Sequence, residues 1–282
     1  MKAWLPALLL GLAGCAAATA PESTPLAANA RYVALGSSFA AGSGFGPIKP
    51  DTPQRCGRST ENYATLLASK MDLALTDATC GGATTAHVLG PWNELPPQID
   101  AVNADTALVT VTVGGNDIGY VGYLIGEGCR QRGPIKLPDG AQMPCFEPKE
   151  PGAAVYQKLE TDMRALANGV KARAPQAHLV FVQYFPMVPD TLCAAVPLNA
   201  EAARTGRAIG VNLARITAKV AQESGAIVLP MDSIDEAHMP CGKDPWVTAH
   251  PADFKPGDTF PWHPTRAGHA AIADALAERL KQ

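Results

Sequence analysis

The sequence predicts an α/β fold of three layers, in which helices cover both faces of a parallel, five-stranded sheet. Two observations lead to this prediction. Short apolar runs rich in β-branched residues alternate along the chain with longer stretches of helical periodicity. The apolar runs are continuous, as expected for strands buried on both faces. The length of 282 residues suits one large domain, which we place at residues 30–282.

The first half of the chain supplies three strands. Residues 31–35 form a short apolar run that breaks at a glycine followed by two serines. Residues 62–71 have helical spacing, residues 73–78 predict a second strand, and a helix is expected over 98–102. The clearest strand is residues 106–113, T-A-L-V-T-V-T-V, because β-branched residues dominate it.

The second half of the chain continues the alternation and adds two strands. Residues 118–150 are expected to form a long insertion rich in Gly and Pro, of a kind that is usually functional or ordered by crosslinks. The segments that follow are a helix over 153–172, a strand over 178–184, a helix over 200–224, a strand over 226–231, an irregular stretch over 232–259 and a final helix over 265–280.

The charge balance argues against a nucleic-acid partner. The chain has 23 basic and 26 acidic residues, a formal net charge of −3 and no basic run. Nucleic-acid-binding domains usually carry a basic patch or stripe. Internal repeats and heptad arrays are also absent from the sequence. We therefore expect no nucleic-acid partner, and we also expect a monomer.

The N-terminus has the pattern of an export signal. Lys2 is followed by an apolar core over 3–12 that is too short to span a bilayer as a stable helix. The stretch then ends in Leu-Ala-Gly-Cys15, which resembles a bacterial lipobox. We expect a lipoprotein signal over 1–14, lipidation of Cys15 and a tether over 15–29, with an exported protein held at the membrane by its lipid. The alternative is a plain signal cleaved at Ala18 or Ala20.

Cysteine usage also indicates export. Of the seven cysteines, six remain when Cys15 is set aside, and six cysteines in an exported chain suggest three disulfides. Fifteen pairings are possible, and the sequence alone does not choose between them. We expect sequential pairing, which would pin three separate loops. A zinc site is disfavoured because no clustered Cys and His spacing is present, and we expect no metal and no cofactor. The expected pairs are Cys56–Cys80, Cys129–Cys145 and Cys193–Cys241.

Four turns carry the chemistry of the chain. Three follow predicted strands: Gly36-Ser37-Ser38, Gly81-Gly82-Ala83 and Gly114-Gly115-Asn116-Asp117; the fourth, at His263, opens the final helix. Turns at the carboxyl ends of parallel strands converge on one edge of the sheet. A serine, an approachable glycine N–H, an amide side chain and a histidine are the groups that nucleophilic acyl transfer needs.

In these turns the chain resembles the SGNH or GDSL hydrolases. Their first block is matched by G-S-S-F-A-A-G at 36–42, their glycine by Gly82, their G-x-N-D block by residues 114–117 and their histidine block by H-P-T-R-A-G-H at 263–269. The matches keep their order from residue 32 to residue 269. Within the family the chain is most similar to secreted, disulfide-containing esterases and lipases of the actinobacterial type. The resemblance implies a flavodoxin-like sheet.

The resemblance also implies residue roles. Ser38 would be the nucleophile, and His263 would take its proton and return it to the leaving alcohol. The oxyanion hole would consist of the backbone N–H groups of Ser38 and Gly82 and the side-chain amide of Asn116. His269, further along the same helix, is expected to be structural.

Two departures from the family pattern stand out. Ser37 occupies the place of an aspartate that normally precedes the nucleophile. Phe260 stands three residues before His263, where the family usually has the acid of the triad. The histidine still needs an acceptor for its Nδ1 proton. We expect the main-chain carbonyl of Phe260, with the carboxylate of Asp258 as the alternative.

The sequence therefore predicts an exported serine esterase or lipase that forms an acyl-enzyme on Ser38 with a Ser-His dyad. Within that class, deacetylation of surface polysaccharide is an alternative. From another class, a non-catalytic lipoprotein that binds glycan or lipid on the same scaffold is the competing hypothesis, supported by the missing acid.

Overall fold

The computed structural model describes residues 1, 26–137, 139–255 and 257–281. Apart from Met1, the predicted lipoprotein signal, Cys15 and the tether as far as residue 25 lie outside the described residues.

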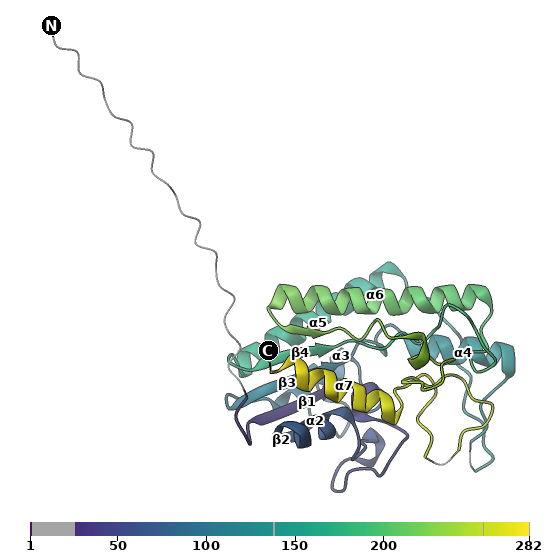
Figure 1. The fold of residues 1–282 in the computed structure, drawn as a ribbon, viewed down its shortest axis with the longest axis horizontal. Helices are drawn as coiled ribbons and strands as arrows, with labels where there is room; N and C mark the ends of the chain where they lie inside the picture. Colours follow the sequence, from purple (N-terminus) through teal and green to yellow (C-terminus); the bar gives the residue numbers. More distant parts are fainter. Residues whose placement is uncertain (2–25, 138, 256, 282) are drawn as a thin grey trace.

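The core of the fold is a five-stranded parallel sheet, as predicted. Its strand order is β2-β1-β3-β4-β5, and Figure 1 labels the first four of these strands. The strands are β1 (Arg31–Gly36), β2 (Ala74–Asp77), β3 (Thr106–Thr112), β4 (His178–Val182) and β5 (Ile227–Leu229). From β1 the chain moves to β2 on one side and then to β3 on the other. The carboxyl ends of β1 and β3 therefore form the topological switch point, where open α/β folds place their ligands.

Helices cover both faces of the sheet. They are α1 (Ser38–Ala41), α2 (Tyr63–Met71), α3 (Thr85–Leu89), α4 (Tyr120–Arg132), α5 (Ala153–Arg173), α6 (Ala200–Ser224) and α7 (Arg266–Arg279), with 3-10 helices η1 (Gln54–Cys56), η2 (Gln98–Ala101) and η3 (Glu236–His238). On one face α2 packs on α7; on the other α5 packs on α6, with α3 against α5 and α4 against α6 (Figure 1). This arrangement confirms the predicted three layers.

The long helix α6 shows how the sequence sets these elements. Asn199 caps its N-terminus by accepting the N–H of Ala202, and Gly225 ends it in a left-handed conformation. Apolar residues repeat along one face of the helix, and this face is buried against α5, β4 and β5.

The prediction for residues 118–150 is wrong in one respect, because the segment contains the helix α4. Its glycines lower the helical propensity of the sequence. The structure gives two of them a packing role: a Cβ at Gly126 would meet Pro148, and a Cβ at Gly128 would meet the ring of His250. Close approach of neighbouring segments, which local propensity does not reveal, therefore accounts for the difference.

Three disulfides cross-link the loops at the carboxyl side of the sheet. They join Cys56 to Cys80, Cys129 to Cys145 and Cys193 to Cys241, which is the sequential pairing. The first lies directly before Gly81 and Gly82, so it links the loop after α1 to the turn that follows β2.

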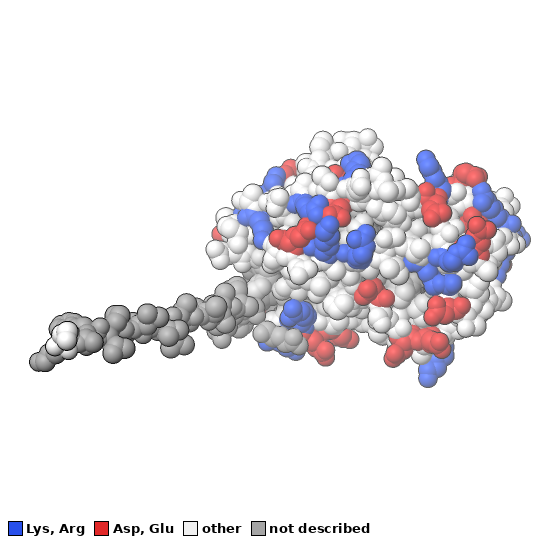
Figure 2. All heavy atoms as spheres, turned by 90° about the horizontal axis from the view of Figure 1, so that it is seen from above, with Lys and Arg blue, Asp and Glu red and all other residues white. Residues whose placement is uncertain are grey.

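Charged side chains of both signs mix on the surface. On the face shown in Figure 2, basic and acidic side chains lie side by side over the two long helices. Arg164 and Lys219 both pair with Glu160, and Arg164 also pairs with Glu223 at 2.7 Å. This face therefore presents a mixed charge pattern.

Candidate active site

The turn after β1 is fixed to its neighbours by hydrogen bonds. Gly36 has a φ of 135°, and a Cβ there would press on the carbonyl oxygen of Thr112. The side-chain amide of Gln98 accepts the Gly36 N–H at 2.8 Å and donates to the Gly36 carbonyl at 3.1 Å. The N–H of Ser37 donates to the Thr112 carbonyl at 2.9 Å. Helix α1 then begins at Ser38, which places this serine at the switch point.

Ser38 and His263, which are 225 positions apart in sequence, meet at the carboxyl end of the sheet. The Oγ of Ser38 lies 2.7 Å from the Nε2 of His263. The other ring nitrogen, Nδ1, lies 2.8 Å from the carbonyl oxygen of Pro261. A carbonyl can only accept, so this contact assigns the proton to Nδ1 and leaves the lone pair of Nε2 facing the serine. An imidazole in this tautomer can accept the serine proton.

The acceptor for the Nδ1 proton is therefore not the predicted one. The carbonyl of Phe260 instead accepts the hydroxyl of Thr248 at 2.7 Å. The carboxylate of Asp258 accepts the backbone N–H of Lys255 at 2.8 Å. Both predicted acceptors are thus engaged elsewhere, and the expectation of Phe260 or Asp258 is corrected to Pro261.

Backbone geometry explains why the acceptor lies two residues before the histidine. Trp262 is fully buried and has a φ of 60°, and this left-handed residue turns the chain so that the Pro261 carbonyl faces the His263 ring. Thr248 clamps the same turn: its hydroxyl accepts the His263 N–H at 3.1 Å, and its own N–H donates to the His263 carbonyl at 2.9 Å. The Pro261 carbonyl thus holds the imidazole at Nδ1, and Thr248 holds the backbone of the same residue.

Burial keeps the His263 ring neutral. Desolvation lowers its pKa from 6.5 to about 4, and the hydrogen bond to the Pro261 carbonyl opposes this shift only in part. Aromatic rings surround the imidazole, with Phe39 at 5.0 Å and Phe260 at 6.1 Å between ring centroids. At neutral pH the ring is therefore in its basic form.

Three N–H donors lie on the turns that follow β1, β2 and β3. Within the part of the chain that the structure describes, the backbone N–H groups of Ser38 and Gly82 have no acceptor. Asn116 donates one amide proton to the Ala83 carbonyl at 2.9 Å and retains a second. Because β1 lies between β2 and β3, the turns that carry Gly82 and Asn116 lie on either side of the Ser38 turn. Such donors are suited to stabilising an oxyanion.

The carboxylate of Asp117 braces the turn after β2, a role that the sequence does not reveal. It accepts the N–H of Thr85 at 3.1 Å and also the hydroxyl of Thr85, at the start of α3. Burial raises the pKa of Asp117, and these hydrogen bonds oppose the rise. The residue next to Asn116 thus fixes the segment that follows Gly82.

His269, expected to be structural, lies on α7 away from the serine hydroxyl. It is fully buried, and its Nδ1 accepts the N–H of Tyr63 at 3.2 Å. Desolvation, and to a smaller extent the neighbouring His263, lower its pKa from 6.5 to about 3. The ring packs against Phe45 and Tyr63 and anchors α7 to α2.

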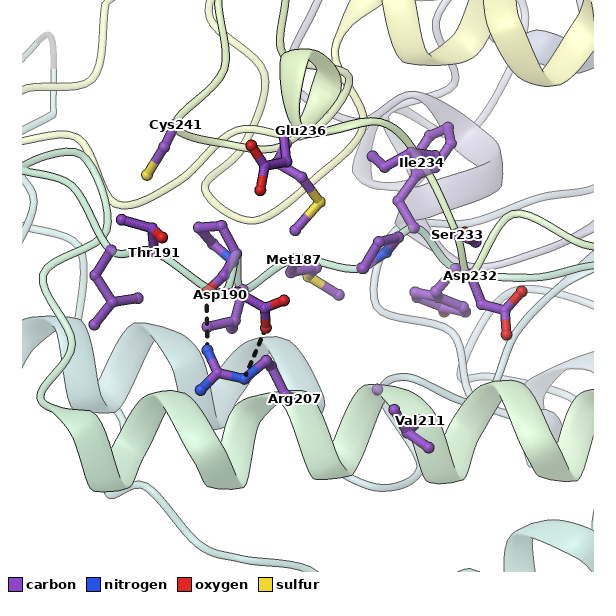
Figure 3. A pocket seen from close by; sticks show the side chains of 18 of the residues that line it. Met187, Asp190, Thr191, Arg207, Val211, Asp232, Ser233, Ile234, Glu236 and Cys241 are labelled. Carbon is purple, nitrogen blue, oxygen red and sulfur yellow. Dashed lines mark hydrogen bonds and ion pairs between the residues drawn. The ribbon is translucent and has the colours of Figure 1, made fainter.

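Two of the cavities in the described part of the chain lie at the carboxyl side of the sheet, and neither is lined by Ser38 or His263. The larger, of about 550 Å³, lies between the segment after β4, α6 and the segment after β5. In Figure 3, Arg207 on α6 reaches towards Asp190, while Ile234 and Glu236 form the opposite side. The smaller, of about 430 Å³, is lined by Cys80 and Trp92 beside the Gly82 turn.

Neither a cluster of metal-binding side chains nor a membrane-spanning helix is found among the described residues. They contain no group of three or more His, Cys, Asp or Glu side chains that could hold a metal ion. Among the helices formed by these residues, none is long and apolar enough to cross a membrane.

The fold and this arrangement of groups define a class of proteins, the carboxylic ester hydrolases. Comparison with known proteins gives the family. The sequence model of the GDSL-like Lipase/Acylhydrolase family matches residues 34–271. The chain belongs to this family and is a carboxylic ester hydrolase.

Several similar proteins come from the bacterial genus Streptomyces. Lipase 2 of Streptomyces coelicolor is 32% identical over 97% of this chain and 92% of its own length. The crystal structure of an extracellular lipase from Streptomyces rimosus has a TM-score of 0.69 at 25% identity, covering 88% of this chain and 98% of that one. That of phospholipase A1 from Streptomyces albidoflavus has a TM-score of 0.68 at 23% identity, covering 89% and 99%.

Proposed function

We propose that Ser38 and His263 form the catalytic dyad of this ester hydrolase. The contact of 2.7 Å between Ser38 Oγ and His263 Nε2 carries the proposal, together with the Pro261 carbonyl that fixes the tautomer. Serine Oγ attacks the ester carbonyl carbon as its proton passes to Nε2. The charge on the carbonyl oxygen is stabilised by the N–H groups of Ser38 and Gly82 and by the amide of Asn116.

The second half of the reaction uses the same groups. The tetrahedral intermediate expels the alcohol, which takes the proton from His263, and an acyl ester on Ser38 remains. Water then gives a proton to Nε2 and attacks the acyl carbon. Collapse of the second intermediate releases the carboxylic acid and returns the proton to Ser38 Oγ.

Replacing Ser38 by alanine tests this assignment. We expect hydrolysis of a p-nitrophenyl ester to fall by a factor of at least about 10⁴, as for other serine hydrolases that lose their nucleophile. Ser43→Ala is a matched control, because this nearby serine is buried and its hydroxyl has no partner among the described residues. Unchanged turnover in Ser38→Ala would refute the assignment. Failure of wild-type protein to react with a fluorophosphonate probe would favour the non-catalytic binding protein.

We propose a lipid ester as the natural substrate class. Relatives of this chain are named lipase and esterase, and a protein of the same fold is named phospholipase A1. Profiling p-nitrophenyl esters from acetate to palmitate separates a lipase from a short-chain esterase. Release of acetate from acetylated polysaccharide, with no activity on longer acyl chains, would instead identify a polysaccharide deacetylase.

We further propose that the protein is exported and acts as a monomeric lipoprotein anchored through Cys15. Three disulfides favour an oxidising compartment. Metabolic labelling with an alkyne fatty acid should label the wild type and leave Cys15→Ser unlabelled. Absence of label and a mature N-terminus after Ala18 or Ala20 would identify a plain secreted protein. Light scattering of the detergent-solubilised protein tests the monomer.

A further inference from the structure

Position 37 carries a hydroxyl where the family pattern has a carboxylate. Ser37 stands at the N-cap position of α1, but its side chain makes no capping bond. Its side chain is buried, at 1% exposure for the residue, and its Oγ lies 3.0 Å from the hydroxyl of Tyr184. Tyr184 follows β4 and is itself buried. Ser37, the neighbour of the nucleophile, is thus hydrogen-bonded to a residue that follows β4. This strand supplies none of the predicted catalytic or oxyanion-hole residues.

The hydroxyl of Tyr184 also reaches the turn after β3. It accepts the N–H of Gly115 at 3.3 Å, next to Asn116. A Cβ at Gly115 would lie 2.8 Å from the Tyr184 ring, so the glycine allows this close approach. One phenol therefore bridges the turn that carries Ser38 and the turn that carries Asn116.

The ring of Tyr184 adds a third connection. Its centroid lies 4.1 Å from that of Phe39, and the Phe39 ring lies 5.0 Å from that of His263. The same ring forms part of the wall of the larger cavity. Tyr184 thus contacts both neighbours of the nucleophile in sequence, Ser37 and Phe39, and touches neither Ser38 nor His263 through a hydrogen bond that the described residues show.

We propose that the Ser37–Tyr184 hydroxyl pair takes the place of the family's aspartate and that Tyr184 is a positioning residue for ester hydrolysis. The pair fixes the nucleophile turn against the Asn116 turn, so that serine N–H and asparagine amide face the same oxyanion. This inference rests on the proposed roles of Ser38 and Asn116.

A neutral pair suits the buried surroundings of the site. Burial raises the pKa of Tyr184 well above its ordinary value, so the phenol stays protonated. A buried carboxylate at position 37 would need full compensation by charged or polar partners. Two hydroxyls hold the same turns together without introducing a charge close to His263.

Removing the Tyr184 hydroxyl tests the proposal. In Tyr184→Phe the ring stays in place, so the cavity wall is unchanged and only the bridge is lost. We expect kcat to fall about tenfold or more, less than the 10²–10³ typical for deleting an oxyanion donor, with KM within about threefold of the wild type. The rate of Ser38 labelling by a fluorophosphonate should fall in parallel. Tyr120→Phe is a matched control, because Tyr120 is an equally buried phenol that packs against Gly210 on α6.

A double-mutant cycle separates positioning from a general loss of structure. If the two hydroxyls act as a unit, Ser37→Ala combined with Tyr184→Phe should have a kcat within about twofold of Tyr184→Phe alone. Multiplicative effects, or a Tyr184→Phe kcat equal to that of Tyr120→Phe, would overturn the proposal. Should Tyr184→Phe fail to fold, Ser37→Ala alone tests the contact. We then expect kcat to fall by at least about threefold, and an unchanged kcat would contradict the proposal. Loss of activity in Ser38→Ala in the same series would support Ser38 as the nucleophile whatever the outcome for Tyr184.

Discussion

Ester hydrolysis should stay nearly constant as the pH is lowered from about 7.5 to about 5.5, because burial lowers the pKa of His263 to about 4. At about pH 5.5 an imidazole with this pKa is about 97% neutral, whereas one with the ordinary value of 6.5 is only about 9% neutral. The two cases differ about tenfold in kcat/KM at that pH. Among the described residues, His269 on α7 interacts electrostatically with His263, and its ring also remains neutral at this pH.

Stability, unlike the rate, should fall towards the acidic end of this range and must be monitored. Both histidines have folded pKa values below 6.5, so the unfolded chain binds protons first as the pH falls. The free energy of unfolding should therefore decrease by up to about 1.4 kcal/mol per pH unit for each histidine, starting near pH 6.5. For His263 the decrease ends at about pH 4, and for His269 at about pH 3.

The assay measures initial rates with a short-chain p-nitrophenyl ester at each pH and reads the product after an alkaline quench. Circular dichroism at every pH verifies that the protein is folded, and Ser38→Ala supplies the background rate. The expected result is an acidic limb of kcat/KM with a midpoint near pH 4. A midpoint near 6.5 in folded protein would refute the reasoning, because it would show that the imidazole is solvated or paired with a carboxylate.

Three further outcomes follow from individual contacts. Asn116→Ala should lower kcat by about 10²–10³ with little change in KM, and steady-state kinetics within about threefold of wild type would contradict its role as an oxyanion donor. Thr248→Val should lower kcat about tenfold, since it removes the hydroxyl that accepts the His263 N–H, and Thr248→Ser should restore the rate. Replacing Cys193 and Cys241 by serine should lower the free energy of unfolding by about 4 kcal/mol, because this disulfide closes the longest of the three described loops, with a separation of 48 residues. Urea titration measures this loss, and an unchanged unfolding midpoint would contradict the prediction.

The elements that set the sheet were readable in the sequence because they follow local rules. Continuous β-branched runs such as residues 106–113 have few alternatives to a buried strand. The convergence of the turns after β1 and β3 then follows from parallel strand direction alone. Helix α4 escaped prediction because its glycines serve contacts with Pro148 and His250, which are remote in the sequence.

The histidine acceptor was mispredicted for a different physical reason. A fixed spacing to Phe260 assumes a regular backbone between acceptor and histidine, but Trp262 adopts a left-handed conformation that no local motif announces. Tyr184 was missed because nothing in its sequence neighbourhood marks its hydroxyl. Only the pairing of β3 with β4 brings that hydroxyl within reach of Ser37 and Gly115.

The carbonyl acceptor at His263 has a consequence for the charges that form during the reaction. The His263 ring contacts a carbonyl at Nδ1 and aromatic rings on its sides, so an imidazolium formed during attack would have no carboxylate partner among the described residues. Its nearest counter-charge would be the oxyanion that forms at the same moment on the substrate. Because both charges appear and vanish together in a buried site, the resting enzyme avoids the desolvation of a permanent ion pair. Stabilisation of the transition state then depends more strongly on the oxyanion donors. The position of the Ser38 turn relative to the Asn116 turn, which the Tyr184 hydroxyl bridges, would therefore matter for the rate.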